Sequence, residues 1–288
     1  MYSITKIMAM VDGSIYAQSV CDHTAWLAQK TNASVDLVHV LAEQQSAADD
    51  VSNLSGSIGF GARTALMEEL VELDSQKAKL SHKIGRAILD EAKIRMHDDG
   101  IEAVTTRLRN GNIVETVEDS DQGADLIVIG KRGIAAEHDM LHLGINLERV
   151  VRSSLKPVLV ASRVFKPINR LLVAYDGGNS VNKAIEHLAN SVVFKDIDCQ
   201  LLAVGSESSK GAQKIQKAAE QLRNVGLSVD VDIEQGQPEE VISRHVETDG
   251  FDLLVMGGYG HSHIRNLFVG STTSAMLASC KIPVLLFH

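Results

Sequence analysis

The sequence has few cysteines and aromatic residues, no excess of basic residues and no long apolar run. Its three cysteines, Cys21, Cys199 and Cys280, are far apart and form no CxxC pair, so we expect buried thiols in a reducing, cytoplasmic protein. No stretch approaches the roughly 20 apolar residues that cross a bilayer, which predicts no membrane span. The N-terminal "MYSITKIMAMVDGS" lacks the apolar run and cleavage site of a signal peptide and is typical of a strand.

The charge and size of the chain restrict its partners and its architecture. A formal net charge of −9 disfavours nucleic-acid binding, which usually needs a basic face, but leaves a small anionic ligand open. Hydrophobic residues make up 44% and aromatics 4%, which favours cores of Val, Ile, Leu and Ala. A length of 288 residues is natural for two domains of ordinary size.

Three sequence segments occur twice in the same order, which indicates an internal duplication. The pairs are "KIMAMVDGS" (6–14) with "RLLVAYDGGNS" (170–180), "DLIVIGKRG" (125–133) with "DLLVMGGYG" (252–260), and "LKPVLVAS" (155–162) with "KIPVLLFH" (281–288). We therefore predict a first domain at 1–162 and a second at 168–288. The copies are 164 residues apart at Asp12 and Asp176 but 127 apart at Gly130 and Gly257, so the first copy carries an insertion, at about 46–99.

Within each copy, short apolar runs alternate with segments of helical period. Continuous apolar runs such as 7–11 and 126–129 are typical of strands covered on both faces. The alternation predicts an α/β fold in which each copy is a five-stranded parallel open sheet with helices on both faces, Rossmann-like in form. Ser14 and Ser180 are expected to cap helices, and Pro238 to begin one.

The insertion divides into two parts of different composition. Residues 46–62 are polar and glycine-rich, which predicts a loop. Residues 63–99 carry apolar positions at helical spacing, which predicts a long helix broken near Asp74–Ser75. The charged Lys77 interrupts the apolar stripe and weighs against a coiled coil.

The run "MGGYGHSHIRNLFVGSTT", residues 256–273, combines glycines that follow a strand with hydroxyl residues that precede a short helix. Glycines allow backbone N–H groups to approach an oxyanion, and a helix N-terminus attracts one, so phosphate is the natural guest. Each glycine alone is more simply explained as the end of a strand or helix. Neither GxxxxGK[ST] nor a GxGxxG after the first strand is present, which excludes two familiar phosphate loops.

The spacing Gly257-x2-Gly260-x9-Gly270-Ser271 resembles the ATP-binding signature G-x2-G-x9-G-[S/T] of the universal stress protein (UspA) family. The resemblance extends over both copies, including the opening "VDGS" and the closing "PVLV", and the duplicated form looks like tandem, UspE-like bacterial members. It implies an adenine nucleotide alpha hydrolase-like fold and ATP as ligand, with Mg²⁺ on its phosphates.

The resemblance also implies a role for individual residues of the second copy. Ala174 and Val204 would lie along the adenine, Asp176 near adenine and ribose, and Met256 and Gly257 beside the ribose. The phosphates would be held by a second set, Gly260, His261, Gly270, Ser271 and Thr272. A carboxylate at 176 can accept from ribose hydroxyls, but it can equally cap the turn "DGGNS".

The first copy departs from this signature. It keeps Asp12, Val40, Gly130 and Gly133, but ten residues precede Gly144. Position 145 is isoleucine, which offers no hydroxyl and has a stiff side chain. Lys131 and Arg132 could still attract an anion. We expect altered or weak ligand binding there, or a structural role.

Other motifs are weaker. "HSH" at 261–263 and the pair His138 and His142 lack acidic or cysteine partners at zinc-site spacing, so no protein-only metal site is expected. "YDGGNS" at 175–180 lacks two residues of the SGGxDS loop of ATP pyrophosphatases, and no catalytic triad is discernible by spacing.

These features favour a cytoplasmic ATP-binding protein that acts as a regulatory or protective module in a stress response. A slow ATPase or phosphotransferase using the same site is one alternative, and a nucleotide-free interaction scaffold is the other. The resemblance implies pairing through the last strands, "PVLVAS" and "PVLLFH", which tandem copies can satisfy within the chain, with a homodimer left open.

Overall fold

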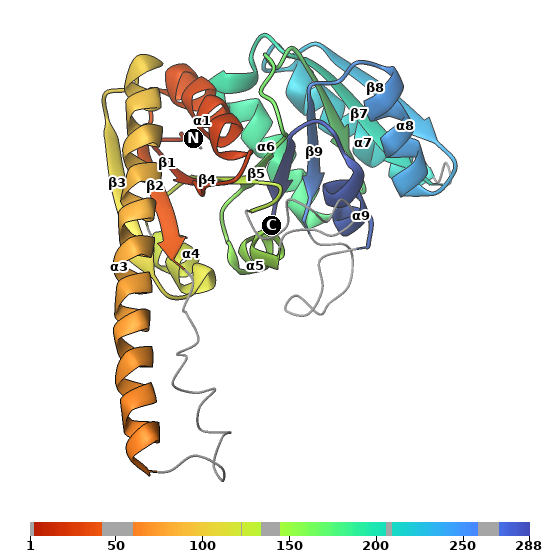
Figure 1. Ribbon diagram of the computed structural model, residues 1–288. Helices are drawn as coiled ribbons and strands as arrows, with labels where there is room; N and C mark the ends of the chain where they lie inside the picture. Colours follow the sequence, from red (N-terminus) through yellow and green to blue (C-terminus); the bar gives the residue numbers. More distant parts are fainter. Residues whose placement is uncertain (1–2, 42–59, 122, 134–144, 206–208, 259–270) are drawn as a thin grey trace.

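A single ten-stranded sheet with helices on both faces forms the centre of the computed structural model (Figure 1). The structure describes residues 3–41, 60–121, 123–133, 145–205, 209–258 and 271–288. The strands are β1 (Lys6–Met10), β2 (Ser34–Leu41), β3 (Val104–Asn110), β4 (Leu126–Gly130), β5 (Val158–Ala161), β6 (Arg170–Ala174), β7 (Asp198–Val204), β8 (Val229–Glu234), β9 (Leu253–Gly257) and β10 (Val284–Phe287). The helices are α1 (Ala17–Thr31), α3 (Phe60–Asp98), α4 (Ile113–Asp121), α5 (Ile145–Ser153), α6 (Asn179–Asn190), η3 (Val192–Phe194), α7 (Ser209–Arg223), α8 (Pro238–Thr248) and α9 (Ser271–Ser279).

The strand order β3-β2-β1-β4-β5-β10-β9-β6-β7-β8 is the same in the two halves when read from each outer edge inward. All neighbours within a half are parallel. The prediction of two tandem five-stranded parallel sheets is therefore confirmed. The exact boundaries 1–162 and 168–288 stay a prediction.

The central strands are apolar throughout because helices cover both of their faces. One hydrophobic core lies under α1, α3, α6 and α7 and includes the fully buried Leu37, Met96 and Ile215. The other lies under α4, α5, α8 and α9 and includes Val150 and Met276. Each core runs through both halves of the chain, so the halves share their packing.

The two halves join edge to edge through β5 and β10. These strands are antiparallel, with Leu159 opposite Leu285, which makes the sheet continuous. On one face, the rings of Trp26 and Phe194 lie 6.5 Å apart across the joint, and the ring of His187 lies 5.2 Å from that of Phe287. The predicted pairing through the last strands is satisfied within the chain.

The helix α3 is longer and more regular than the sequence suggested. It runs unbroken through Asp74 and Ser75 for 39 residues, so the predicted break is wrong. Its i→i−4 hydrogen bonding needs no interruption, since neither residue is Pro or Gly. Only its carboxyl-terminal part packs on β2 and β3, and its amino-terminal part projects past the sheet (Figure 1). At the first close contact, a Cβ on Gly85 would lie 2.7 Å from Leu108 Cδ1, so this position favours glycine.

The predicted helix starts have different outcomes. Pro238 begins α8, as expected from its fixed φ and missing N–H. The N-cap of α1 is Tyr16, without a side-chain capping hydrogen bond, so the prediction that Ser14 caps this helix is wrong. Ser14 lies two residues earlier, where its Oγ accepts from the N–H of Tyr16 at 3.2 Å. Ser180 lies inside α6, whose N-cap is Gly178, so the prediction that Ser180 caps this helix is wrong. The helix begins earlier there because Asp176 already accepts the N–H of Gly178.

None of the helices that the structure describes combines the length and the apolar character needed to cross a membrane.

Candidate nucleotide site at the strand ends

Each half of the sheet has one point where the strand order reverses: between β1 and β4, and between β6 and β9. Crossover helices leave in opposite directions at such a point, so a crevice opens outside the carboxyl ends of the strands. Asp12 and Gly130 lie at this edge in the first half, and Asp176 and Gly257 lie there in the second. The structure thus brings these described residues of each copy to one edge, and their role in binding stays a prediction.

The turn after β6 is built by Asp176. Its Oδ1 accepts from the backbone N–H of Gly178 at 2.8 Å, and Gly177 has a φ of +69°, which favours glycine. Asp176 also lines a pocket of about 120 Å³ together with Val204, Gly205 and Lys214. The alternative role of Asp176 as a turn cap is therefore confirmed, and the same geometry leaves it beside a pocket.

The end of β9 approaches the start of α6 closely. A Cβ on Gly257 would lie 3.1 Å from Ser180 Cβ, so glycine lets the strand end and the helix meet. Met256 pairs in register with Ala174 on β6, which places these two predicted residues side by side. The Thr273 hydroxyl donates to the carbonyl of Gly257 at 3.2 Å and ties α9 to the same strand end.

The amino-terminal turn of α9 supplies the described part of the predicted phosphate loop. Ser271 is its first residue, and the Thr272 hydroxyl donates to Glu239 Oε1 of α8 at 2.8 Å. Gly260, His261 and Gly270 lie outside the described residues, as do "HSH" at 261–263 and the pair His138 and His142.

Sequence reasoning missed Glu239. The Thr272 hydroxyl holds the pKa of this carboxyl below its usual range by donating a hydrogen bond to the ionised form. Glu239 and Thr272 are far apart in sequence and meet because α8 and α9 pack side by side on one face of the sheet. No local pattern could have shown this pairing, although acidic residues in the first turn of α8 are readable from "PEEV".

The first half holds a larger cavity at the carboxyl ends of its strands. Its volume is about 330 Å³, within the range of about 300–1,000 Å³ of small-molecule sites. Four of the predicted first-copy residues, Asp12, Val40, Gly130 and Gly133, line it. The fifth, Gly144, lies outside the described residues.

The charged residues around this cavity differ from expectation. Arg132 lines it, together with Arg149 of α5, which sequence reasoning did not single out. Lys131 instead donates to the carbonyl of Cys280 in the second half at 2.7 Å, and burial lowers its pKa to about 8. The cavity is therefore lined by two arginines and Asp12, and Lys131 ties the halves together.

These features define a class of protein: a tandem α/β chain of two Rossmann-like domains that join through their last strands, each with a glycine-ended strand at its crevice. The chain belongs to the universal stress protein family, whose family model matches residues 3–162 and 200–288.

Individual relatives agree with this assignment. The chain is 37% identical to the universal stress protein Slr1230 of Synechocystis over 285 residues, which is 98% of this chain and 99% of that protein. Its fold is similar to the crystal structure of a universal stress protein from Archaeoglobus fulgidus, at a TM-score of 0.70 and 21% identity, covering 99% and 97% of the two chains. A universal stress protein solved in complex with cAMP matches 43% of this chain and 98% of its own, at a TM-score of 0.37 and 18% identity.

Proposed function

We propose that this protein binds ATP in its second domain and acts as a regulatory or protective module in a stress response. The observation that carries the proposal is the signature Gly257-x2-Gly260-x9-Gly270-Ser271, whose first glycine ends β9 at the reversal point of a parallel sheet. Adenine nucleotides bind at such points in open α/β sheets.

The chemistry of the described residues supports this proposal. Asp176 and Val204 line one pocket, where the carboxylate would accept from ribose hydroxyls and Val204 would contact the adenine. The adjacent Ala174 and Met256 supply apolar surface for the base and sugar. The amino-terminal turn of α9, with Ser271 and Thr272, offers backbone donors to the phosphates. The assignment of Gly260, His261 and Gly270 to the phosphates rests on the signature alone.

The first domain is proposed to bind a different anionic ligand, or to bind ATP more weakly. The cavity lined by Arg132 and Arg149 favours an anion. Ile145, however, begins α5 where the signature requires a hydroxyl residue. The expected stoichiometry is therefore one ATP for each chain.

The ATP proposal is tested by a matched pair of variants. Gly270→Val places a β-branched side chain where backbone must approach phosphate, and we expect ATP affinity to fall at least tenfold. Gly144→Val makes the same change at the equivalent position of the first domain and should leave that affinity unchanged. Titration calorimetry, with mass spectrometry of the ligand that copurifies, provides the readout. Equal ATP affinity in Gly270→Val and the parent protein would contradict the site.

A slow ATPase is the second candidate, and Glu239 is the observation that favours it. A carboxylate beside the first turn of α9 can position a water or hold Mg²⁺ near the phosphates. If the protein is an ATPase, Glu239→Gln should slow phosphate release while ATP still binds. If the parent protein releases phosphate no faster than Gly270→Val, the protein binds ATP without hydrolysing it.

We also propose that the protein is cytoplasmic and that its small-molecule partner is an adenine nucleotide. All three cysteines are buried and unpaired, and burial raises the pKa of Cys21 and Cys199 to about 12, which supports a reducing compartment.

A scaffold without nucleotide would show neither copurified adenine nor a thermal shift with ATP. That result would replace the ATP proposal with the scaffold.

A further inference from the structure

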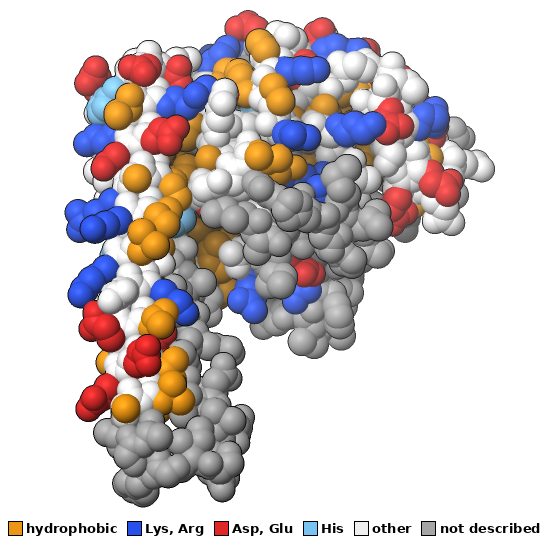
Figure 2. Space-filling model, in the orientation of Figure 1, with side chains coloured by type: hydrophobic (Ala, Val, Ile, Leu, Met, Phe, Trp, Pro, Cys, Tyr) orange, Lys and Arg blue, Asp and Glu red, His pale blue; other side chains and the backbone are white. Residues whose placement is uncertain are grey.

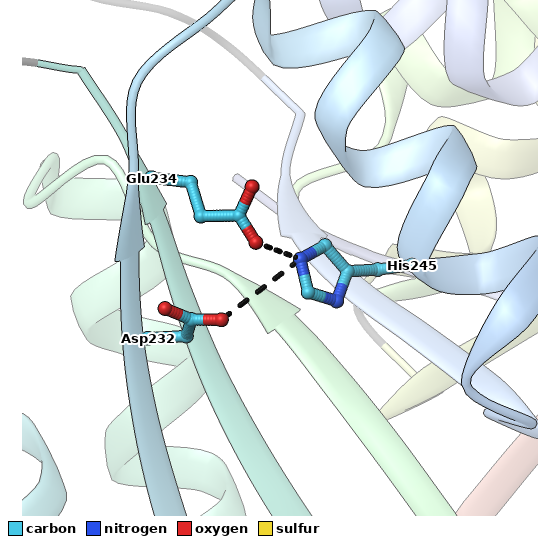
Figure 3. A group of neighbouring side chains, drawn as sticks. All are labelled: Asp232, Glu234 and His245. Carbon is cyan, nitrogen blue, oxygen red and sulfur yellow. Dashed lines mark hydrogen bonds and ion pairs between the residues drawn. The ribbon is translucent and has the colours of Figure 1, made fainter.

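Three side chains with metal-binding groups meet where β8 faces α8 (Figure 3). Asp232 and Glu234 are two residues apart on β8 and therefore point to the same face of the sheet. His245 reaches them from α8, and the nearest ligand atoms of all three lie within 4.8 Å of one another. Ile233, between the two acids, points to the other face of β8, where it lines the pocket of Asp176, so the cluster does not share that pocket.

His245 is held in one orientation by the residue that ends its helix. Its Nδ1 lies 2.6 Å from Asp249 Oδ2, and the other oxygen of Asp249 accepts from the Thr248 hydroxyl at 2.6 Å. Its Nε2 lies 2.7 Å from Glu234 Oε1 and 4.0 Å from Asp232 Oδ2. A histidine that ligates a metal commonly has its other ring nitrogen fixed by a carboxylate in this way.

Negative charge surrounds the ring of His245. Its two ring nitrogens each lie within hydrogen-bonding distance of a carboxylate oxygen, and a third carboxylate, that of Asp232, lies 4.0 Å from Nε2. Arg244, paired with Glu234, is the cation that neighbours these groups in the described residues. A divalent ion between Nε2 and the two carboxylates of β8 would be attracted by this charge.

We propose that Asp232, Glu234 and His245 form a site for a divalent transition-metal ion of the Zn²⁺ type. One imidazole and two carboxylates are a ligand set that suits zinc, with an open position for water, whereas Mg²⁺ prefers oxygen ligands alone. Zinc bonds of about 2.0–2.2 Å place ligand atoms roughly 3–4 Å apart, so small side-chain movements close the site. The side chains of Asp232 and Glu234 are 43% and 27% exposed, which leaves the ion a route from solvent.

Zn²⁺ titration of the full, nucleotide-free chain after chelator treatment tests the site. We expect the parent protein to bind one Zn²⁺ that Asp232→Asn binds at least tenfold more weakly. Asp230→Asn is the matched control, since it removes the same charge from the same face of β8, two residues away. Asp249→Asn should weaken binding by roughly tenfold to a hundredfold through the orientation of His245.

The ring resonances of His245 report whether the metal binds at this cluster. In the proposed site, Zn²⁺ shifts the His245 signal in the parent protein and in Asp230→Asn, and does so only at higher metal concentration in Asp232→Asn. An unchanged His245 signal, or equal Zn²⁺ affinity in the Asp230 and Asp232 variants, overturns the proposal. The cluster would then be a set of hydrogen bonds between α8 and β8.

A second, independent observation concerns the projecting part of α3. The residues Leu66, Leu70, Leu73, Lys77, Leu80 and Ile84 alternate steps of four and three, the spacing of a coiled-coil seam. Leu73, Leu80 and Ile84 are 44%, 58% and 51% exposed. Figure 2 shows apolar side chains along this helix, between charged ones, where it leaves the body of the protein.

The charges along this helix are arranged in two blocks. Residues 64–76 contain four acidic residues and no lysine or arginine, whereas residues 75–89 contain four lysines or arginines and no acidic residue. In a parallel helix pair like charges would face each other. In an antiparallel pair centred near Ser75 the acidic block of one helix lies beside the basic block of the other.

We infer that α3 binds α3 of a second copy of this chain in antiparallel orientation. The seam then places Leu66 against Ile84 of the partner subunit and Leu70 against Leu80 of the partner subunit. Lys77 lies near Asp74 of the partner subunit, where a charged seam position fixes the register. Gly85 is the first buried residue among the described side chains of α3, so the two bodies sit at opposite ends of the pair. The β5 and β10 edges are already paired within the chain and are unavailable for this contact.

Light scattering across a concentration series tests this pairing in the full chain. Leu80→Asp should convert the dimer to a monomer. Val71→Asp should not, since Val71 is 60% exposed on the same helix but lies off the seam. Glu69→Lys should weaken the dimer, and adding Lys83→Glu should restore it. Failure of this restoration, or a parent protein that stays monomeric, overturns the inference.

Disulfide crosslinking reports the orientation of the helices. In the antiparallel pair, Gln76→Cys lies near its own copy and crosslinks, whereas Leu66→Cys is far from its own copy and does not. The native cysteines are buried, so they do not compete. Crosslinking of Leu66→Cys in place of Gln76→Cys contradicts the antiparallel arrangement.

Discussion

At the scale of single residues, one aspartate shapes the turn after the first strand of each half. Asp12 Oδ1 accepts from the N–H of Ser14 at 3.0 Å, and Asp176 Oδ1 accepts from the N–H of Gly178 at 2.8 Å. These bonds orient the start of the following helix without any ligand. The resemblance assigns this aspartate to a nucleotide, and the structure shows that it also shapes a turn. A substitution there therefore changes the turn as well as any contact with a ligand.

The buried His187 predicts a loss of stability in acid. Burial lowers its pKa to about 4 from 6.5, so the folded protein binds this proton less readily than the unfolded chain. Its contribution to the unfolding free energy is complete above pH 6.5 and disappears as the pH falls from 6.5 to about 4. The loss is on the order of 3 kcal/mol.

Urea unfolding at several pH values, compared with His187→Leu, measures this effect. The variant should lose less stability between pH 6.5 and 4, although burial also lowers the pKa of His288 to about 4 and that of His23. Parallel pH profiles for the two proteins would show that His187 already accepts a proton in the fold.

At the scale of elements, glycines at the strand ends allow helices to approach the sheet. A Cβ on Gly130, at the end of β4, would lie 2.8 Å from Tyr16 Cβ, just before α1. Gly257 at the end of β9 meets Ser180 of α6 in the same way. The glycines therefore have a packing reason that is independent of any phosphate. This explains why the glycine count alone is a weak guide to function.

Gly130→Ala should destabilise the protein by about 1–3 kcal/mol, because Tyr16 Cβ is fixed to its backbone and cannot rotate away. Gly133→Ala is the comparison, since among the described residues its Cβ would meet the Asp12 carboxylate, at 2.8 Å. A carboxylate can rotate, so we expect a smaller cost there. Thermal unfolding of both variants checks the order, and an equal cost would contradict the packing argument.

At the scale of the whole molecule, the pairing of β5 with β10 converts two domains into one sheet with outer edges at β3 and β8. β8 carries Asp230, Asp232 and Glu234, and β3 carries Arg107 and Arg109. Charged side chains on an edge strand discourage pairing with another sheet. The β5 and β10 edges are thus paired within the chain, so the second copy that we infer would bind at another part, α3.

An isolated second domain, residues 168–288, should behave differently from the full chain. Removing the first half exposes the apolar β10 edge, whose residues are buried in the intact protein. We expect this fragment to dimerise through β10 in antiparallel register, and Leu285→Asp to prevent it. Sedimentation gives the mass of both. A fragment that is folded but monomeric would contradict this prediction, because the exposed β10 edge would then be stable in water without a partner.

The sequence alone determined the features that depend on local pattern. Continuous apolar runs predicted the strands, the repeated segments predicted two similar halves, and the glycine spacing predicted the family, which its model confirms. Each of these signals lies within a few tens of residues, where strand and helix periods act directly.

Only the tertiary structure decided which distant groups meet. It directed Lys131 to the carbonyl of Cys280, set Glu239 beside Thr272, and brought His245 to Asp232 and Glu234. It also showed α3 as one unbroken helix that projects past the sheet. These outcomes follow from the packing of helices on a shared sheet, where partners far apart in the chain approach within hydrogen-bonding distance. Periodicity within one segment contains no information about that approach.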